Sequence, residues 1–227
     1  MTDLKIIKDS FSDKSLFDMA MTHRSWVNEH TGVRRSNERL EFLGDAILEY
    51  VVSYILYQRF TQKEEGYLTA LRASLVNTVS LAAVAKKLKL GSQIHLSKGE
   101  EEGGGRENTS LLADTVEALI GAVYLDSGLD GATTFIEKNI LNDLSKKAKE
   151  PLKDSKSTLQ EYVQAKGFST PRYQVVEESG PDHDKKFVTD VWVGNEVWGR
   201  GVGTNKSTSE QEAAKNAIKN YCEKDLK

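Results

Sequence analysis

The 227-residue sequence predicts an all-helical first domain followed by a small α+β domain of order α-β-β-β-α. Through the first 150 residues, apolar side chains recur at helical spacing, with no sustained alternation of period two. A charged stretch containing Pro151 follows, which is typical of a linker. Beyond it, short alternating apolar runs indicate strands between two helical patterns. The predicted boundaries are 1–148 for the helical domain, 149–155 for the linker and 156–226 for the second domain.

The helices of the first domain are predicted from apolar residues three and four positions apart. Ile47, Val51 and Ile55 share one face of a helix by this spacing. The same pattern predicts further helices over 68–75, 81–88, 115–125 and 135–144.

The second domain begins with a helix over 157–166, which Gly167 closes. Alternating residues predict strands over 173–178 and 187–193, and Gly194-Asn195 is a hairpin turn leading to a third strand over 196–200. Ser207 to Glu210 fits a capping box that starts the last helix.

Composition restricts the classes of protein this chain can be. Hydrophobic residues make up 38% and charged residues 29%, which suits a folded globular chain rather than a disordered one. No apolar run approaches the roughly 18 residues of a membrane span, so no membrane association is expected. The single cysteine, Cys222, allows no internal disulfide and no zinc site, and the cytoplasm is the expected compartment. The net charge of −3 disfavours a nucleic-acid binder unless several acids are metal ligands.

The first candidate site lies on a helix that carries Glu38, Glu41 and Asp45 at positions i, i+3 and i+7. These spacings place the three carboxylates on one face. A solvated acidic face is the common explanation, but the same stripe continues through Leu48 and Val52 toward the core. Like charges one turn apart also destabilise a helix unless a cation compensates them.

A second acidic pair repeats this arrangement. Asp114 and Glu117 lie three residues apart, and their stripe runs through the apolar residues Leu111, Ala118, Gly121 and Leu125. If the two helices cross, their carboxylates form an all-oxygen site, which favours the hard cations Mg²⁺ or Mn²⁺. Such ions activate water and stabilise phosphoryl oxygens during hydrolysis. The spacing alone leaves the metal site and the solvated face both open.

Two further motifs have competing interpretations. Glu65 follows Glu64 at the start of a predicted helix, where acids favour the helix dipole, so capping is the simpler explanation. His23, beside Arg24, serves either structure or substrate, and structure is the more frequent role for such a residue.

At these residues the chain resembles bacterial ribonuclease III. Residues 37–48 are similar to that family's signature, and residues 113–121 are similar to its second acidic motif. The α-β-β-β-α unit resembles the double-stranded RNA-binding domain joined to it, through residues 157–161, 180–183 and 201–206. The resemblance covers nearly the whole chain, in the family's order.

The resemblance implies a homodimeric endonuclease that cuts both strands of double-stranded RNA, leaving 5′ phosphates and short 3′ overhangs. Expected substrates are ribosomal RNA precursors and other structured transcripts, including messenger and transfer RNA precursors. The implied Mg²⁺ ligands, with Mn²⁺ as a substitute, are Glu41, Asp45, Asp114 and Glu117. Asp45 and Glu117 are implied to be most directly catalytic, Glu38 and Glu65 to be outer acids nearer the RNA, and Phe42 to insert into the partner subunit.

The RNA-binding domain is expected to use Gln160 and Glu161 in one minor groove and His183 in a second. Lys206, at the start of the last helix, is expected to bridge the intervening phosphates. Ser207 replaces a lysine frequent in the family, and Ser209 replaces an alanine, which predicts weaker phosphate binding.

Three alternatives are disfavoured. A protein that only binds RNA has no use for the inward-facing acids. A di-iron bundle uses Glu-x-x-His pairs, and the pair Asp114–Glu117 contains no histidine. Residues 200–207 lack the glycine spacing of a phosphate-binding loop, so no nucleotide cofactor is expected.

Overall fold

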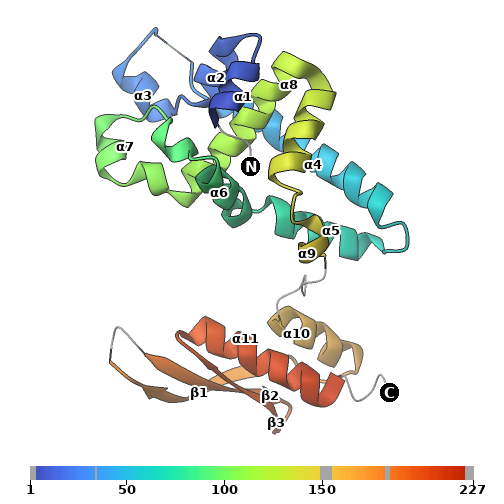
Figure 1. The fold of residues 1–227 in the computed structure, drawn as a ribbon. Helices are drawn as coiled ribbons and strands as arrows, with labels where there is room; N and C mark the ends of the chain where they lie inside the picture. Colours follow the sequence, from blue (N-terminus) through green and yellow to red (C-terminus); the bar gives the residue numbers. More distant parts are fainter. Residues whose placement is uncertain (1–3, 34, 149–154, 182–184, 223–227) are drawn as a thin grey trace. The chain divides into compact units, whose positions relative to one another are not determined.

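The computed structural model describes residues 4–33, 35–148, 155–181 and 185–222 (Figure 1). The chain divides into two compact units, residues 1–152 and 153–227. Most of the predicted linker, residues 149–155, lies outside the described residues, and Ser155 already belongs to a helix.

The first unit is helical, as predicted. Its helices are α1 (Leu4–Ser10), α2 (Lys14–Ala20), α3 (Arg24–Glu29), α4 (Glu38–Arg59), α5 (Glu65–Val76), α6 (Thr78–Lys87), α7 (Lys98–Glu102), α8 (Thr109–Asn139) and α9 (Leu144–Lys147), with short 3₁₀ turns η1 (Leu90–Ser92) and η2 (Gly105–Glu107). Among the described residues, no single helix has the length and apolarity to cross a membrane; only α5 and α6 together reach them, as a pair bent by 43°.

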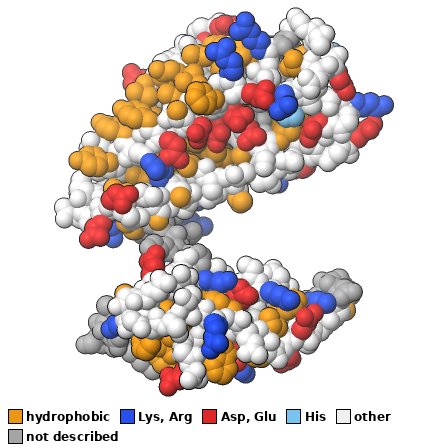
Figure 2. All heavy atoms as spheres, turned by 180° about the vertical axis from the view of Figure 1, so that it is seen from behind, with side chains coloured by type: hydrophobic (Ala, Val, Ile, Leu, Met, Phe, Trp, Pro, Cys, Tyr) orange, Lys and Arg blue, Asp and Glu red, His pale blue; other side chains and the backbone are white. Residues whose placement is uncertain are grey.

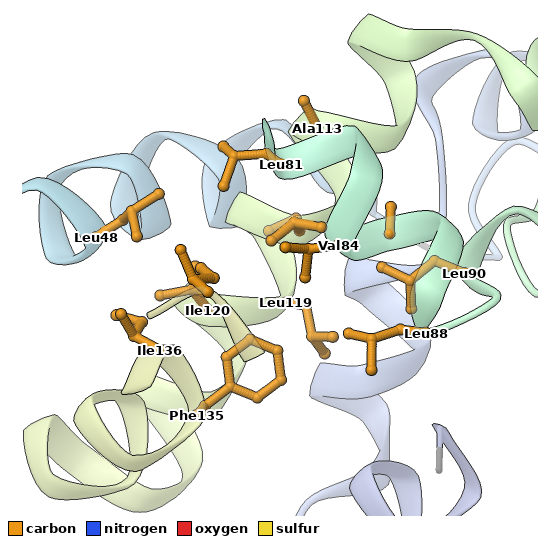
Figure 3. Close-up of a cluster of buried hydrophobic side chains, with 14 of the residues drawn as sticks. Leu48, Leu81, Val84, Leu88, Leu90, Ala113, Leu119, Ile120, Phe135 and Ile136 are labelled. Carbon is orange, nitrogen blue, oxygen red and sulfur yellow. The ribbon is translucent and has the colours of Figure 1, made fainter. Parts of the chain in front are cut away.

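Helix α8 forms the centre of this unit because its middle turns are apolar on every side. Leu119 and Ile120 are fully buried, and they belong to one cluster with Leu48 of α4 and Leu81 of α6 (Figure 3). Burying one such side chain contributes about 1.5–3 kcal/mol, so α4, α6 and α8 are held together mainly by this cluster.

Two glycines let α4 and α8 cross in backbone contact. A Cβ atom at Gly44 would collide with the carbonyl of Glu117, and a Cβ at Gly121 would collide with the carbonyl of Leu40. The acidic turns of both helices flank this crossing point. The glycines therefore set how closely the two sets of carboxylates approach.

Two details of this unit differ from the expectations. The helices predicted over 115–125 and 135–144 are the two arms of α8, separated by a kink where Gly128 adopts a positive φ of 69°, but the second arm ends at Asn139, before the predicted end at residue 144. Leu125, expected to continue the buried stripe, is 53% exposed because the stripe leaves the core before the kink.

The second unit is a three-stranded antiparallel sheet with two helices on one face (Figure 1). Its elements are α10 (Ser155–Ala165), β1 (Arg172–Ser179), β2 (Lys186–Val193), β3 (Glu196–Gly203), α11 (Lys206–Ala217) and a terminal π-helical turn, η3 (Ile218–Cys222). Leu159 and Val163 of α10 pack with Val191 of β2 and Ala213 of α11 in a small separate core.

The start of α11 differs from the prediction. Asn205 caps the helix and exchanges hydrogen bonds with Thr208, so the capping box begins two residues before the predicted Ser207. Asparagine is as good a cap as serine, and the earlier start makes Lys206 the first helical residue.

Candidate active site

The acidic turns of α4 and α8 bring three carboxylates together. Glu41, Asp114 and Glu117 each offer an oxygen within 4.8 Å of the others, and all three side chains are half-buried. They come from the two helices that cross at Gly44 and Gly121. Three of the four predicted metal ligands thus form one cluster, called the acidic cluster below.

The acidic cluster is electrostatically unfavourable as it stands. Burial, and then repulsion from Asp45 and Asp114, raises the pKa of Glu117 to about 7. Burial also raises the pKa of Glu41 and of Asp114. In the described part of the chain none of the three forms an ion pair with a Lys or Arg side chain. An external cation would relieve this repulsion.

The chemistry of these donors fits a divalent ion. All are carboxylate oxygens, with no histidine or cysteine in the group, which is the ligand set that Mg²⁺ and Mn²⁺ prefer. The half-buried position also leaves room for water on such an ion. The geometry can therefore hold a hard metal ion.

The remaining predicted acids lie around the acidic cluster or apart from it. Asp45 is exposed one turn further along α4, and its charge raises the pKa of both Glu41 and Glu117, although its oxygens lie outside the closest group. Glu38 accepts hydrogen bonds from Ser36 and Arg24 at the start of α4.

Glu65 begins α5 and accepts a hydrogen bond from Thr69. It is not part of the acidic cluster. Instead it lines a hollow of about 540 Å³ between α4 and α5, together with Leu56, Phe60, Leu68 and Arg72.

One acid near the acidic cluster, Glu49, was not predicted from the sequence. Glu49 lies four residues after Asp45 on the same face of α4, and its charge contributes to the raised pKa of Glu117. Unlike the acids of the cluster, it has a cation: Arg72 of α5 approaches it to 2.7 Å. The i, i+4 spacing from Asp45 was the available signal.

A hydrophobic surface borders these acids. Figure 2 shows a row of Asp and Glu side chains across the first unit, beside a broad area of hydrophobic side chains. Phe42 is 81% exposed on α4, and Tyr50, Tyr54 and Tyr57 are exposed on the same helix. An exposed apolar area of this kind is typical of a protein interface.

The second unit places the predicted RNA contacts on its surface where they are described. Gln160 and Glu161 are exposed on α10, and Lys206 is exposed at the start of α11. His183 lies outside the described residues. Ser209 is fully buried and hydrogen-bonded to Thr189 at 2.6 Å, so this substitution affects the core and not a phosphate contact.

The fold and the site define a class of protein. A helical unit with a carboxylate cluster able to hold a metal ion, joined to an α-β-β-β-α unit, is the architecture of a nuclease with its own RNA-binding domain.

Comparison with known proteins identifies the family. Residues 13–144 match the family described as Ribonuclease-III-like, and residues 155–221 match the Double-stranded RNA binding motif. Ribonuclease 3 of Natranaerobius thermophilus is 47% identical over 94% of this chain and 93% of its own, and that of Geobacillus kaustophilus is 46% identical over 92% and 85%.

Solved structures agree with these relatives. The crystal structure of the nuclease domain of ribonuclease III from Campylobacter jejuni covers 63% of this chain and 97% of its own, with 40% identity and a TM-score of 0.56. A second structure of that domain, with 43% identity and a TM-score of 0.53 over 60% of this chain and 96% of its own, is described by its flexibility in a region involved in dimer formation. The chain belongs to the ribonuclease III family, and it is an endoribonuclease that acts on double-stranded RNA.

Proposed function

We propose that the acidic cluster holds Mg²⁺, with Mn²⁺ as a substitute, and that RNA is cut there to leave 5′ phosphates and short 3′ overhangs. The observation that carries this proposal is the close approach of Glu41, Asp114 and Glu117, none of which forms an ion pair with a Lys or Arg side chain among the described residues. Asp45 completes the proposed ligand set from the next turn of α4. When bound, the metal supplies activation of water and stabilisation of phosphoryl charge.

The protein side chains then have separate roles. Glu117, the most strongly perturbed acid, anchors the site from α8, and Asp45 reaches toward it from the exposed side of α4. These two are the proposed catalytic residues. Glu38, at the start of α4, is proposed to act as an outer acid nearer the RNA.

The RNA-binding unit is proposed to hold the duplex through Gln160 and Glu161 in one minor groove, His183 in a second and Lys206 on the phosphates between them. Domains of this type span about 16 base pairs and recognise A-form shape and 2′-hydroxyl groups more than sequence. The exposure of Gln160, Glu161 and Lys206 supports these roles.

We further propose that two copies of the chain form a homodimer through the hydrophobic face of α4. Phe42 is the most exposed large apolar side chain of that helix, and the hollow lined by Leu56, Phe60 and Leu68 is large enough to accept a ring. Phe42 directly follows Glu41, and Glu65 lines the hollow. Insertion of Phe42 would therefore bring Glu65 of one copy near the acidic cluster of the other.

The domain boundary at residue 148 is also a proposal. Contacts of the nuclease unit continue to that point, because Tyr67 donates a hydrogen bond to the carbonyl of Ala148 and Lys147 donates one to the carbonyl of Ser74. Residues 1–148 alone should therefore fold and dimerise. They should cut RNA weakly, with a larger loss at physiological than at low salt, because phosphate contacts are missing. An unfolded fragment would place the boundary elsewhere.

The decisive experiment compares long double-stranded RNA with an unstructured single strand, each incubated with the protein in Mg²⁺, Mn²⁺ or EDTA. We expect cleavage of the duplex in either metal and none in EDTA, with product ends read by labelling of 5′ phosphates. Undiminished cutting in excess EDTA would remove the metal proposal. In cells, the proposed setting is the cytoplasm, with precursors of ribosomal RNA and other structured transcripts as substrates.

A further inference from the structure

His23 is fixed against the beginning of α4. The carbonyl of the preceding residue, Thr22, accepts a hydrogen bond from the backbone N–H of Asn37 at 2.9 Å. On the other side of His23, the guanidinium of Arg24 reaches Glu38 at 3.3 Å. The carbonyl of Asn37 in turn accepts from the N–H of Glu41, so His23 lies at the end of the helix that carries the acidic cluster.

The second neighbour of His23 is the segment that precedes α7. The backbone N–H of His23 donates to the carbonyl of His95 at 3.1 Å, and Thr22 and His95 form a parallel bridge. The backbone N–H of Ser97 donates to the hydroxyl of Ser25 at 3.0 Å. The loop carrying His23 is thus held from two directions.

These contacts determine which ring nitrogen carries the hydrogen. His23 caps α3, and its Nδ1 accepts from the N–H of Ser25 at 3.3 Å. The hydroxyl of Ser25 lies 2.8 Å from the same nitrogen and can donate to it as well. With Nδ1 accepting from the N–H of Ser25, the ring carries its hydrogen on Nε2.

The ring also lies within electrostatic range of the acidic cluster, because a positive charge on it would lower the pKa of Asp114 of α8 against the effect of burial. Within the described residues, the hydrogen bonds of the His23 side chain are all made by Nδ1. Nε2–H is therefore the donor of the half-buried ring that remains for another partner, and the carboxylates of the acidic cluster, when ionised, can only accept.

We infer that His23 is a further substrate-contacting residue, whose Nε2–H donates a hydrogen bond to a phosphate oxygen of the RNA strand at the acidic cluster. This inference rests on the proposed function. A phosphodiester anion approaching Glu41, Asp114 and Glu117 is repelled by all three carboxylates, apart from what a bound cation offsets. A fixed hydrogen-bond donor at the edge of this site orients the phosphate and adds no further negative charge.

Two substitutions separate this role from a purely structural one. His23→Asn keeps an oxygen where Nδ1 caps Ser25, since asparagine is a favoured cap, but it removes the distant donor. His23→Gln places an amide donor near the position of Nε2 but loses the cap. His30→Asn is the matched control, because His30 is exposed at the other end of α3 and bonds the carbonyl of Trp26 in its own helix.

The measurements are the single-turnover cleavage rate of double-stranded RNA in Mg²⁺, with enzyme in excess, and the melting temperature of each variant. His23→Asn should melt near the wild-type temperature yet cleave about 10- to 100-fold more slowly, as expected for one lost hydrogen bond to a charged group. His23→Gln should recover most of that rate although it melts lower, and His30→Asn should match the wild type.

If His23→Asn cleaves at the wild-type rate, or if His23→Asn and His23→Gln lose the same fraction of the cleavage rate, the inference is wrong. His23 would then serve only as the structural cap of α3. Failure of the wild-type protein to cut double-stranded RNA in Mg²⁺ would instead remove the proposed function. The two failures are therefore distinguishable in one set of reactions.

Discussion

The two units treat a buried carboxylate in opposite ways. In the RNA-binding unit, Asp190 of β2 is only 4% exposed, and Arg200 of β3 holds it with two hydrogen bonds of 2.6 and 2.8 Å. These bonds hold the pKa of Asp190 below its usual range. In the described part of the nuclease unit, Glu117 has no such partner, and burial and like charges raise its pKa to about 7.

The difference teaches that burial alone does not mark a functional acid; the missing partner does. Asp190 and Arg200 neutralise each other's charge once the sheet has formed, so this carboxylate needs no further cation. The acidic cluster is left without its counter-charge after folding, and a cation from solution can complete it. Binding of a metal ion relieves the repulsion between these carboxylates and is favoured for that reason.

The largest expected effect comes from removing the charge at Glu117. Glu117→Gln keeps the side chain's size but replaces a carboxylate with an amide that carries two donors. Several kcal/mol of transition-state stabilisation should be lost, which corresponds to a rate reduction of at least about 10³. The variant should still shift double-stranded RNA in a gel, because the proposed contacts of Gln160 and Lys206 are in the other unit.

The matched control is Glu137→Gln on the same helix. Glu137 is exposed and pairs with Arg59, outside the acidic cluster, so this variant should cleave at the wild-type rate. If Glu117→Gln cleaves at nearly the wild-type rate, Glu117 is an ordinary acid on a solvated helix face and does not take part in catalysis.

The second effect concerns the backbone contact that assembles the acidic cluster. Gly44→Ala inserts a methyl group against the carbonyl of Glu117, which should destabilise the nuclease unit by about 3 kcal/mol and abolish cleavage. Gly66→Ala is the control: nothing lies near that position in α5, so the higher helix propensity of alanine should leave stability equal or slightly raised. Thermal unfolding of both variants measures the contrast, and equal melting temperatures would contradict the crossing argument.

A smaller effect is expected on the compensated side of the comparison. Asp190→Asn removes the charge from the pair but leaves Arg200, which is 63% exposed, able to bind water. The RNA-binding unit should lose about 1–2 kcal/mol of stability, while cleavage at low salt stays near the wild-type rate. A loss of chemistry comparable to that of Glu117→Gln would show that the two carboxylates do not differ in role.

The smallest effect is a pH dependence of stability without metal. The folded protein holds the Glu117 proton with a pKa of about 7, against 4.5 for a glutamate side chain exposed to water in the unfolded chain. The free energy of unfolding in EDTA should therefore fall as pH rises from about 4.5 to about 7. After allowance for solvent screening, the fall is about 1 kcal/mol.

Glu117→Gln removes this contribution, together with the repulsion that Glu117 exchanges with Asp45, Asp114 and Glu41. The variant should show a smaller fall than the wild type, and Mg²⁺ should stabilise the wild type more at pH 8 than at pH 5.5. Parallel pH profiles for the two proteins in EDTA would argue against a raised pKa at Glu117.

Helical spacing predicted that Glu41 and Asp45 share one face of α4 and that Asp114 and Glu117 share one face of α8, because it decides which side chains lie together on a helix. It left open whether the two faces meet, and the resemblance to ribonuclease III selected these acids as a metal site. The position of Asp45 outside the closest group did not follow from the spacing, because it depends on how α4 rotates against α8 at Gly44. The cap at Asn205 was missed since serine and asparagine offer equivalent acceptors, and only the path of the preceding strand selects between them.

Direct binding of Mn²⁺ tests the central claim, that the acidic cluster is a metal site. Free Mn²⁺ is followed by its electron paramagnetic resonance spectrum while the ion is titrated into the wild type, Glu117→Gln and Glu137→Gln. Saturable binding by the wild type and by Glu137→Gln, weakened at least about tenfold in Glu117→Gln, is the predicted result. Equal binding by all three proteins, or no saturable binding by the wild type, would contradict the account.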